Sequence, residues 1–295
     1  MQQDDHVQHA DATAGAPVAG VVAPAHPSPW FVALDVDGTI LHEDETLDLK
    51  VTEAVLRARD DGHVVTLATG RSWETTRPIL ERLGIAPEYV VCANGALIMR
   101  RDDGPEGERD GGWRREHIET FDPADVLRRI REYLPQGSFM VEDPTGFRLY
   151  TAGMDDWNLD NAREVDFDDL LHTPATRVVV ISPGHDLDEF LAIVEQMGLH
   201  QVSYAIGWTA WLDIAPEGVN KATALERVRQ WIGVPSDRLL AVGDGRNDIE
   251  MFEWAGAAGR AVAMGQAPDE VKAAATEVTD DIDHDGVVAA LDALP

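Results

Sequence analysis

The feature that most constrains the fold is a series of short, largely apolar segments that alternate with helical segments. Three of the apolar segments are predicted strands: Phe31–Leu34, His63–Thr69 and Tyr89–Ala93. Helices are expected between them. Strands that are apolar along their whole length belong in a sheet covered on both faces, and intervening helices supply the crossovers that parallel strands need. The pattern therefore predicts an α/β fold with a Rossmann-like parallel-sheet core.

The middle of the chain breaks this rhythm. A hairpin with a long polar tip is expected over residues 100–119, and two helices and several strands follow before residue 214. Strand pairs combined with two helices predict an α+β unit with an antiparallel sheet. The first pattern then resumes with a helix over residues 221–232 and a strand over residues 239–244. One domain is thus expected to be interrupted by another.

These patterns predict the limits of three parts. Residues 1–29 are rich in Ala, Pro, His and Asp without periodicity, and are expected to be a disordered leader. Residues 30–95 and 215–295 are expected to form the parallel-sheet core. Residues 96–214 are expected to form the inserted α+β domain.

Charge and composition exclude several classes of protein. A formal net charge of −30 argues against binding to nucleic acid or to anionic membranes. No apolar run reaches the roughly 18 residues that span a bilayer, and no secretory signal is visible. Cys92 is the single cysteine, so an internal disulfide and a cysteine-based zinc site are excluded. We expect a cytoplasmic protein, and the sequence does not indicate an oligomeric state.

Polar residues gather where the predicted parallel strands end. Asp35 and Asp37 follow the first strand. Others follow the second strand and the strand over residues 239–244, namely Thr69, Gly70, Arg71, Asp244, Asn247 and Asp248. Ligands of open α/β sheets bind at the carboxyl ends of the strands, so four carboxylates converge there if these strands are neighbours.

Crowded carboxylates repel one another unless a positive charge lies among them. Oxygen ligands around an open site favour Mg²⁺, and Lys221 is the expected second cation. Such a site suits a phosphoryl group. One carboxylate of the Asp35–Asp37 pair can attack phosphorus to form an aspartyl-phosphate. The other can protonate the leaving oxygen and then activate water.

The motifs resemble those of the haloacid dehalogenase-like hydrolases. The segments that carry the resemblance are, in chain order, "LDVDGTIL", "ATGR", Lys221 and "GDGRND". Three further segments, "ANGA", "AMGQAPDEVK" and "DGVV", resemble the Cof-like branch, which contains phosphatases of sugar phosphates and other small phosphomonoesters. The resemblance covers about residues 31–291. It implies that the inserted domain is a cap that closes over the site and selects the leaving group.

The resemblance also implies a role for each matching residue. Asp35 would be the nucleophile, Asp37 the general acid and base, and Thr69 and Lys221 the groups that bind the phosphoryl oxygens. The Mg²⁺ ligands would be Asp35, Asp37 through its carbonyl, Asp244 and Asp248. Further contacts to the substrate or phosphate are expected from Gly70, Arg71, Asn94 and Asn247. Arg71 could instead face solvent, and Asn94 could only make a turn.

We therefore expect a Mg²⁺-dependent phosphatase that hydrolyses a small phosphorylated metabolite, either a sugar phosphate or a cofactor-type phosphomonoester. A phosphomutase with the same nucleophile and a non-catalytic binding protein are the alternatives. A membrane pump would need spans that the sequence lacks. Gln266 departs from the asparagine common in relatives, and this difference is expected to affect closure or substrate preference.

Overall fold

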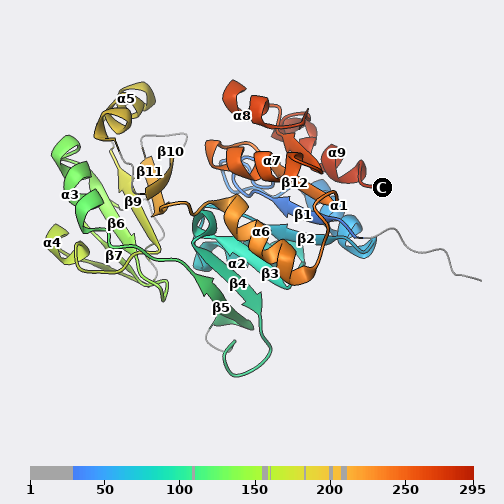
Figure 1. Ribbon diagram of the computed structural model, residues 1–295, viewed down its shortest axis with the longest axis horizontal. Coiled ribbons are helices and arrows are strands. Elements are labelled where there is room, and N and C mark those ends of the chain that lie inside the picture. The colour runs from blue at the N-terminus through green and yellow to red at the C-terminus, as the bar shows by residue number, and fades with distance from the viewer. Residues whose placement is uncertain are drawn as a thin grey trace, which may run out of the picture.

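The structure is a computed structural model that describes residues 29–107, 110–154, 159, 161–182, 184–198, 202–206 and 211–295. The predicted leader lies outside these residues, apart from residue 29. The described chain forms a larger α/β part and a smaller α+β part, joined by two connections (Figure 1). The second part is made of residues 124–216, which we call the insert. None of the described helices is long and apolar enough to cross a membrane.

The larger part is built on a parallel sheet of five strands in the order β14-β13-β12-β1-β2. Their bounds are β1 (Phe31–Leu34), β2 (Val64–Leu67), β12 (Leu239–Gly243), β13 (Arg260–Ala263) and β14 (Glu277–Val278). Strand β1 pairs with β2 on one side and with β12 on the other. The α/β fold with a parallel sheet is therefore confirmed, and the strands that precede Asp35, Thr69 and Asp244 are neighbours.

An antiparallel sheet continues this sheet beyond β2. It contains β3 (Tyr89–Cys92), β4 (Leu97–Arg101) and β5 (Trp113–Ile118) in that order. A parallel bridge between Ala68 and Val91 connects it to the end of β2. The hairpin expected over residues 100–119 is present, and its first strand pairs with β3. The predicted domain limit at residue 96 falls between these paired strands, and the domain limits themselves stay a prediction.

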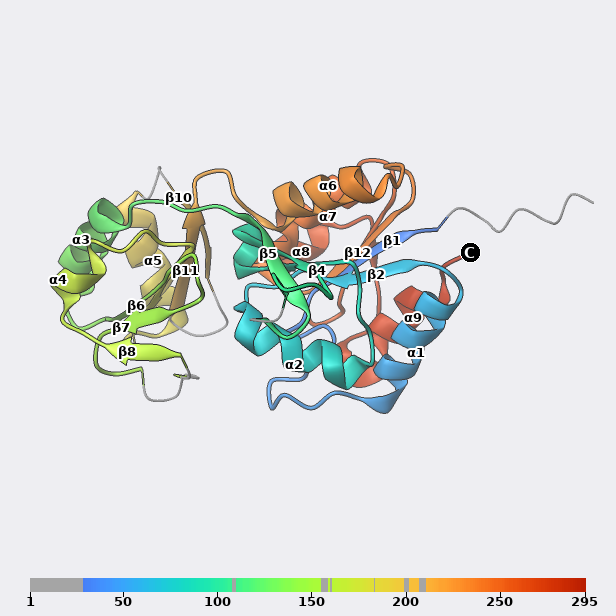
Figure 2. The same cartoon turned by 90° about the horizontal axis from the view of Figure 1, so that it is seen from below.

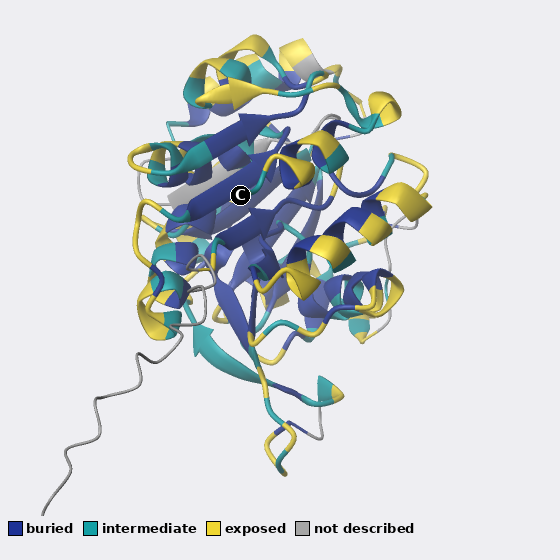
Figure 3. Ribbon diagram, turned by 90° about the vertical axis from the view of Figure 1, so that its right-hand side faces the viewer, coloured by how far each residue is buried: buried dark blue, intermediate teal, exposed yellow. Residues whose placement is uncertain are grey.

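Helices cover both faces of the parallel sheet (Figure 2). One apolar cluster includes residues of α1 (Leu49–Asp60), α2 (Trp73–Leu83) and α9 (Gly286–Asp292). The other includes residues of α6 (Lys221–Ile232), α7 (Ile249–Gly256) and α8 (Asp269–Ala274). The central strands are buried throughout, as Figure 3 shows. This double cover explains why the strands are apolar along their whole length.

Two short elements differ from the expectation. Helix α9 and strand β14 were not predicted. Each is short, seven and two residues, so the periodicity that marks longer elements has no room to develop.

The insert is a six-stranded sheet in the order β10-β11-β9-β6-β7-β8. Its strands are β6 (Ser138–Glu142), β7 (Arg148–Tyr150), β8 (Ala162–Glu164), β9 (Arg177–Ile181), β10 (Val202–Ile206) and β11 (Trp211–Pro216). Its helices are α3 (Ala124–Tyr133), α4 (Phe167–Leu170) and α5 (Leu187–Met197). All strand pairs except β7–β8 are antiparallel. The predicted α+β insertion is therefore confirmed.

Candidate active site

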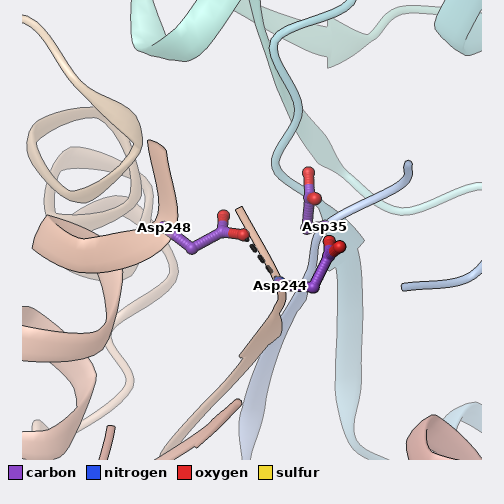
Figure 4. A group of neighbouring side chains, drawn as sticks. All are labelled: Asp35, Asp244 and Asp248. Carbon is purple, nitrogen blue, oxygen red and sulfur yellow. Dashed lines mark hydrogen bonds between the residues drawn. The ribbon is translucent and has the colours of Figure 1, made fainter. Parts of the chain in front are cut away.

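Three carboxylates meet at the carboxyl end of the parallel sheet (Figure 4). Asp35 follows β1, Asp244 follows β12, and Asp248 ends the short 3₁₀ helix Arg246–Asp248. One carboxylate oxygen of each residue lies within 4.8 Å of the other two, and all three residues are buried. The pairing of β1 with β12 brings together residues more than 200 positions apart in the chain.

Lys221 is the cation of this cluster. It is the first residue of α6 and is wholly buried. Its Nζ donates to Oδ1 of Asp35 at 2.6 Å and to Oδ1 of Asp248 at 2.7 Å. The side chain of Asn220 accepts from the backbone N–H of Thr223 and caps the helix, which fixes where α6 begins. The cap therefore holds Lys221 over the ends of β1 and β12.

One lysine balances only one of the three carboxylates. Burial, with the charge of Asp248, raises the pKa of Asp35 to about 7, although Lys221 acts in the opposite direction. Burial also raises the pKa of Asp244 to about 8, together with the charges of Asp35 and Asp248. Burial alone would lower the pKa of Lys221, but its two carboxylate partners raise it further above its usual value. The cluster therefore holds less positive charge than its three carboxylates require.

The residues present fit a small divalent cation. Buried carboxylate oxygens are the ligands that Mg²⁺ prefers, and the remaining repulsion among them is the electrostatic condition that a cation relieves. Asp248 is oriented by backbone donors, because its Oδ2 accepts from the N–H groups of Asp244 and Gly245 at 3.0 and 2.9 Å. The second carboxylate oxygen of Asp248 therefore remains directed at Lys221.

Asp244 is held by two residues that sequence reasoning did not place in the site. Thr39 donates through Oγ1 to Asp244 Oδ1 at 3.3 Å. Gln266 donates through Nε2 to the Gly38 carbonyl at 2.5 Å and lies 3.4 Å from Asp244 Oδ2. The departure at Gln266 was noted in the sequence, but its contact with the acidic cluster depends on the packing of two loops.

Asp37 lies apart from the buried cluster. Its side chain is half exposed, and Arg71 donates to both of its carboxylate oxygens, with Nε 3.1 Å from Oδ1 and 2.9 Å from Oδ2. Arg71 also reaches Glu45 at 3.1 Å. The structure thus gathers three of the four expected carboxylates and turns the fourth outward, with Arg71 as its partner.

The remaining predicted residues line the same end of the sheet. Thr69 is buried, and its Oγ1 accepts from the backbone N–H of Arg71 at 3.0 Å. Asn247 donates to Asn94 Oδ1 at 3.0 Å. A side chain at Gly70 would meet the amide of Asn94 at 3.1 Å, so Gly70 lies close to it. The predicted residues that follow β2, β3 and β12 therefore lie close together.

Asp213 extends this network into the insert, and sequence reasoning missed it. Asp213 lies on β11 and accepts from Asn94 Nδ2 at 2.8 Å. Its other oxygen accepts from Arg177 Nε on β9, also at 2.8 Å. Asn94 has φ 49°, the left-handed region, which asparagine tolerates better than most residues. A buried acid inside the apolar segment "WLDIAP" was the one available signal.

Comparison with known proteins identifies the family of this chain. The family model of the haloacid dehalogenase-like hydrolases matches residues 32–110 and 133–291. The 5-amino-6-(5-phospho-D-ribitylamino)uracil phosphatase YitU of Bacillus subtilis is 29% identical over 88% of this chain and 95% of its own length. The phosphoglycolate phosphatase of Natronomonas pharaonis is 31% identical over 88% of this chain and 96% of its own length.

The fold is also found in solved structures. A solved haloacid dehalogenase-like hydrolase from B. subtilis superposes with a TM-score of 0.72 and 23% identity, covering 90% of this chain and all of that one. The ordered motifs, the inserted α+β unit and the family match over most of the chain agree. The chain therefore belongs to the Cof-like branch of the haloacid dehalogenase-like hydrolases.

Proposed function

We propose that this protein is a Mg²⁺-dependent phosphatase that hydrolyses a small phosphorylated metabolite through an aspartyl-phosphate on Asp35. The observation that carries the proposal is the position of Asp35. It is buried against Lys221 at 2.6 Å in a cluster of three carboxylates, while Asp37, two residues later, reaches solvent. In this proposal Asp35 forms the bond to phosphorus and Asp37 exchanges protons.

In the first step, a carboxylate oxygen of Asp35 forms a bond to phosphorus as the bond from phosphorus to the leaving oxygen breaks. Asp37 gives its proton to that leaving oxygen, so an alcohol departs. Lys221 keeps positive charge beside Asp35 and the transferred group.

In the second step, water attacks the phosphorus of the aspartyl-phosphate. Asp37 takes a proton from this water, and the bond between phosphorus and Asp35 breaks to release phosphate and the free carboxylate. The cycle ends with both aspartates in their starting states. Arg71, which pairs with Asp37 in the structure, would hold this acid at the mouth of the site.

The phosphoryl oxygens would be bound by donors at the ends of the strands. These donors are the Thr69 hydroxyl, the Gly70 and Arg71 segment, Lys221, and the amides of Asn94 and Asn247. Asp35, Asp244, Asp248 and the backbone carbonyl of Asp37 would hold Mg²⁺, which supplies positive charge beside the developing negative charge on those oxygens.

The insert would act as the cap that selects the leaving group. Three relatives are named as phosphatases of 5-amino-6-(5-phospho-D-ribitylamino)uracil, of phosphoglycolate and of pyridoxal phosphate, which supports a small phosphomonoester as the substrate here. We also place the enzyme in the cytoplasm, which fits a chain with a single, buried cysteine.

The test is phosphate release from a panel of phosphorylated sugars, sugar acids and cofactors, with Mg²⁺ and with a chelator. Release from one or a few substrates, lost with the chelator, is the expected result. A phosphomutase would return the phosphate to its substrate, and a binding protein would release none. Absence of release by the folded, Mg²⁺-loaded protein from the whole panel would contradict the proposal.

A further inference from the structure

Glu45 lies in a turn over residues 42–46, in the loop that follows Asp37. The backbone N–H of Glu45 donates to the carbonyl of His42 at 2.9 Å, which closes the turn. Glu45 has φ 62°, in the left-handed region that favours glycine and asparagine. A glutamate at this position carries backbone strain that a glycine would avoid. Strained residues of this kind are concentrated at functional sites, which indicates a role for the side chain of Glu45.

The carboxylate of Glu45 contacts the arginine that pairs with Asp37. Arg71 donates through Nη1 to Oε1 of Glu45 at 3.1 Å. The other two nitrogens of its guanidinium group, Nε and Nη2, donate to the carboxylate of Asp37, with Nε 2.9 Å from Oδ2. Every nitrogen of the guanidinium group is therefore engaged by one of the two acids.

Contacts on two edges of a guanidinium group fix its orientation. The group is planar and rigid, and a carboxylate bound along one edge leaves the plane free to tilt about that edge. Glu45 binds the third nitrogen, so Arg71 cannot tilt without breaking a contact. The position and angle of the Asp37 carboxylate therefore depend on Glu45 through Arg71.

Helix α2 supplies the frame for these contacts. Arg71 lies just before α2, and Arg82, near the end of α2, donates through Nη2 to the carbonyl of Glu45 at 2.8 Å. The two arginines thus fasten Glu45 to one rigid element by its side chain and by its backbone. The side chain of Glu45 is 66% exposed, and an ion pair as exposed as this contributes little to stability. A gain in stability therefore does not explain the strained glutamate.

We propose that Glu45 is a positioning residue for the general acid and base, and that it acts by orienting Arg71 against Asp37. The proposal rests on the proposed function, in which Asp37 gives its proton to the leaving oxygen. Protonation matters most when the leaving oxygen is strongly basic, as in an alkyl ester. It matters least when the leaving group departs readily as an anion, as in a p-nitrophenyl ester. Loss of Glu45 is therefore expected to slow the hydrolysis of alkyl esters selectively.

The test compares benzyl phosphate with p-nitrophenyl phosphate in the presence of Mg²⁺. Each leaving group has one aromatic ring, but benzyl alcohol needs a proton to depart and p-nitrophenolate does not. Glu45→Gln removes the charge and keeps the size of the side chain. Its kcat/KM on benzyl phosphate is expected to fall about tenfold, which is part of the acceleration that general acid catalysis supplies. Its kcat/KM on p-nitrophenyl phosphate should stay within about twofold of the wild-type value.

The kinetic constants on benzyl phosphate separate positioning from substrate binding. The loss in Glu45→Gln should lie in kcat, and KM should stay within about twofold, because Glu45 contacts Arg71 and not the substrate. Glu43→Gln is the matched control for charge. It removes a carboxylate from an exposed position of the same turn and should leave both esters unchanged.

A glycine variant separates the side chain of Glu45 from its backbone. Glu45→Gly relieves the strained conformation, so it should keep or raise Tm while it reproduces the selective loss on benzyl phosphate. Asp285→Gly is its matched control, because Asp285 is also an acid with positive φ, 60°, and is paired with Lys50. This control should leave the ratio of kcat/KM values on the two esters as it is in the wild-type enzyme.

Three results would overturn the inference. One is an equal loss on both esters, or a loss that lies in KM, in the folded variants of Glu45. Another is an unchanged kcat/KM on benzyl phosphate in both variants. The third is wild-type hydrolysis of p-nitrophenyl phosphate alone, because no basic leaving group would then be protonated. A wild-type enzyme that hydrolyses neither ester with Mg²⁺ would instead count against the phosphatase itself, so the two failures are distinguishable.

Discussion

Asp35 and Asp37 stand two residues apart and lie in different surroundings. Asp35 is 5% exposed and bonded to Lys221, whereas the side chain of Asp37 is half exposed and bonded to Arg71. Beyond the end of β1 the chain turns at Gly38, so the alternation of a strand no longer applies to the second acid. The two carboxylates are thereby given distinct environments, which suits one nucleophile and one proton donor.

Asp35→Asn tests the nucleophile. The amide keeps the volume and removes a charge from a crowded cluster, so the protein is expected to fold with unchanged or higher stability. Turnover is expected to fall by about 10⁴-fold or more, as when other enzymes lose their nucleophile. Steady-state phosphate release and thermal unfolding are the measurements. Asp60→Asn, at an exposed position of α1, is the control. Near-normal turnover of Asp35→Asn would show that Asp35 is not the nucleophile.

Lys221→Met tests the buried cation. The change leaves Asp35 and Asp248 buried without their shared partner, which typically lowers the free energy of unfolding by about 3–5 kcal/mol. Lys50→Met makes the same substitution at an exposed lysine paired with Asp285, where a much smaller loss is expected. Urea denaturation without Mg²⁺ measures both. Equal losses for the two variants would show that Lys221 does not balance the cluster.

At the scale of elements, the loop after β1 is shaped by its contact with the end of β12. Gly38 has φ +76°, and a Cβ there would lie 2.1 Å from Oδ2 of Asp244. Only glycine combines this backbone conformation with such a close approach. The glycine of "DVDGT" therefore serves two purposes, the turn that follows Asp37 and the space that Asp244 occupies.

Gly38→Ala tests this contact against a matched glycine. Gly62 also has positive φ, +91°, but no atom lies within 4 Å of a Cβ built there. Both alanine variants should lose roughly 1–3 kcal/mol of stability from backbone strain. Only Gly38→Ala should also lose activity, about a hundredfold, because Asp244 is displaced. Equal specific activities of the two folded variants would contradict the assigned contact.

At the scale of the whole molecule, repulsion among negative charges is not fully balanced by positive groups. The chain carries a formal net charge of −30, and its active site adds three buried carboxylates around one lysine. A net charge of this size favours solubility but opposes compactness. Binding of a divalent cation would relieve this repulsion where it is most concentrated. Metal binding and folding are therefore expected to be coupled.

The coupling predicts how stability varies with pH. Asp35 and Asp244 have folded-state pKa values of about 7 and 8, above the usual 3.8. At pH values between 3.8 and these raised pKa values, the folded protein therefore binds more protons than the unfolded chain. The contribution of these two carboxyl groups to stability is therefore lost as pH rises. In the presence of a chelator, Tm should fall from pH 5 to pH 8. Mg²⁺ should raise Tm more at pH 8 than at pH 6.

Scanning calorimetry with Mg²⁺ and with a chelator measures both effects. Asp244→Asn is the control, because the loss of Tm with rising pH in the chelated protein should be smaller in this variant. A Tm difference between Mg²⁺ and chelator that does not change with pH would contradict the coupling.

The sequence by itself determined the class of fold and most of the residues of the site. Apolar strands, helical crossovers and polar strand ends are local patterns, and each is visible within about ten residues. They were sufficient to predict the parallel sheet, the α+β insertion, and Asp35, Lys221 and Asp244 as members of one site. Even so, their convergence depended on an assumption that the strands before Asp35 and Asp244 are neighbours.

Tertiary structure decided everything that depends on strand order and on the packing of loops. The pairing of β1 with β12 makes three acids one cluster, and the loop after β1 turns Asp37 away from it. The contacts of Gln266 with Gly38 and of Asp213 with Asn94 join residues more than 100 positions apart. No local pattern encodes such contacts, because they follow from how distant segments pack against one another.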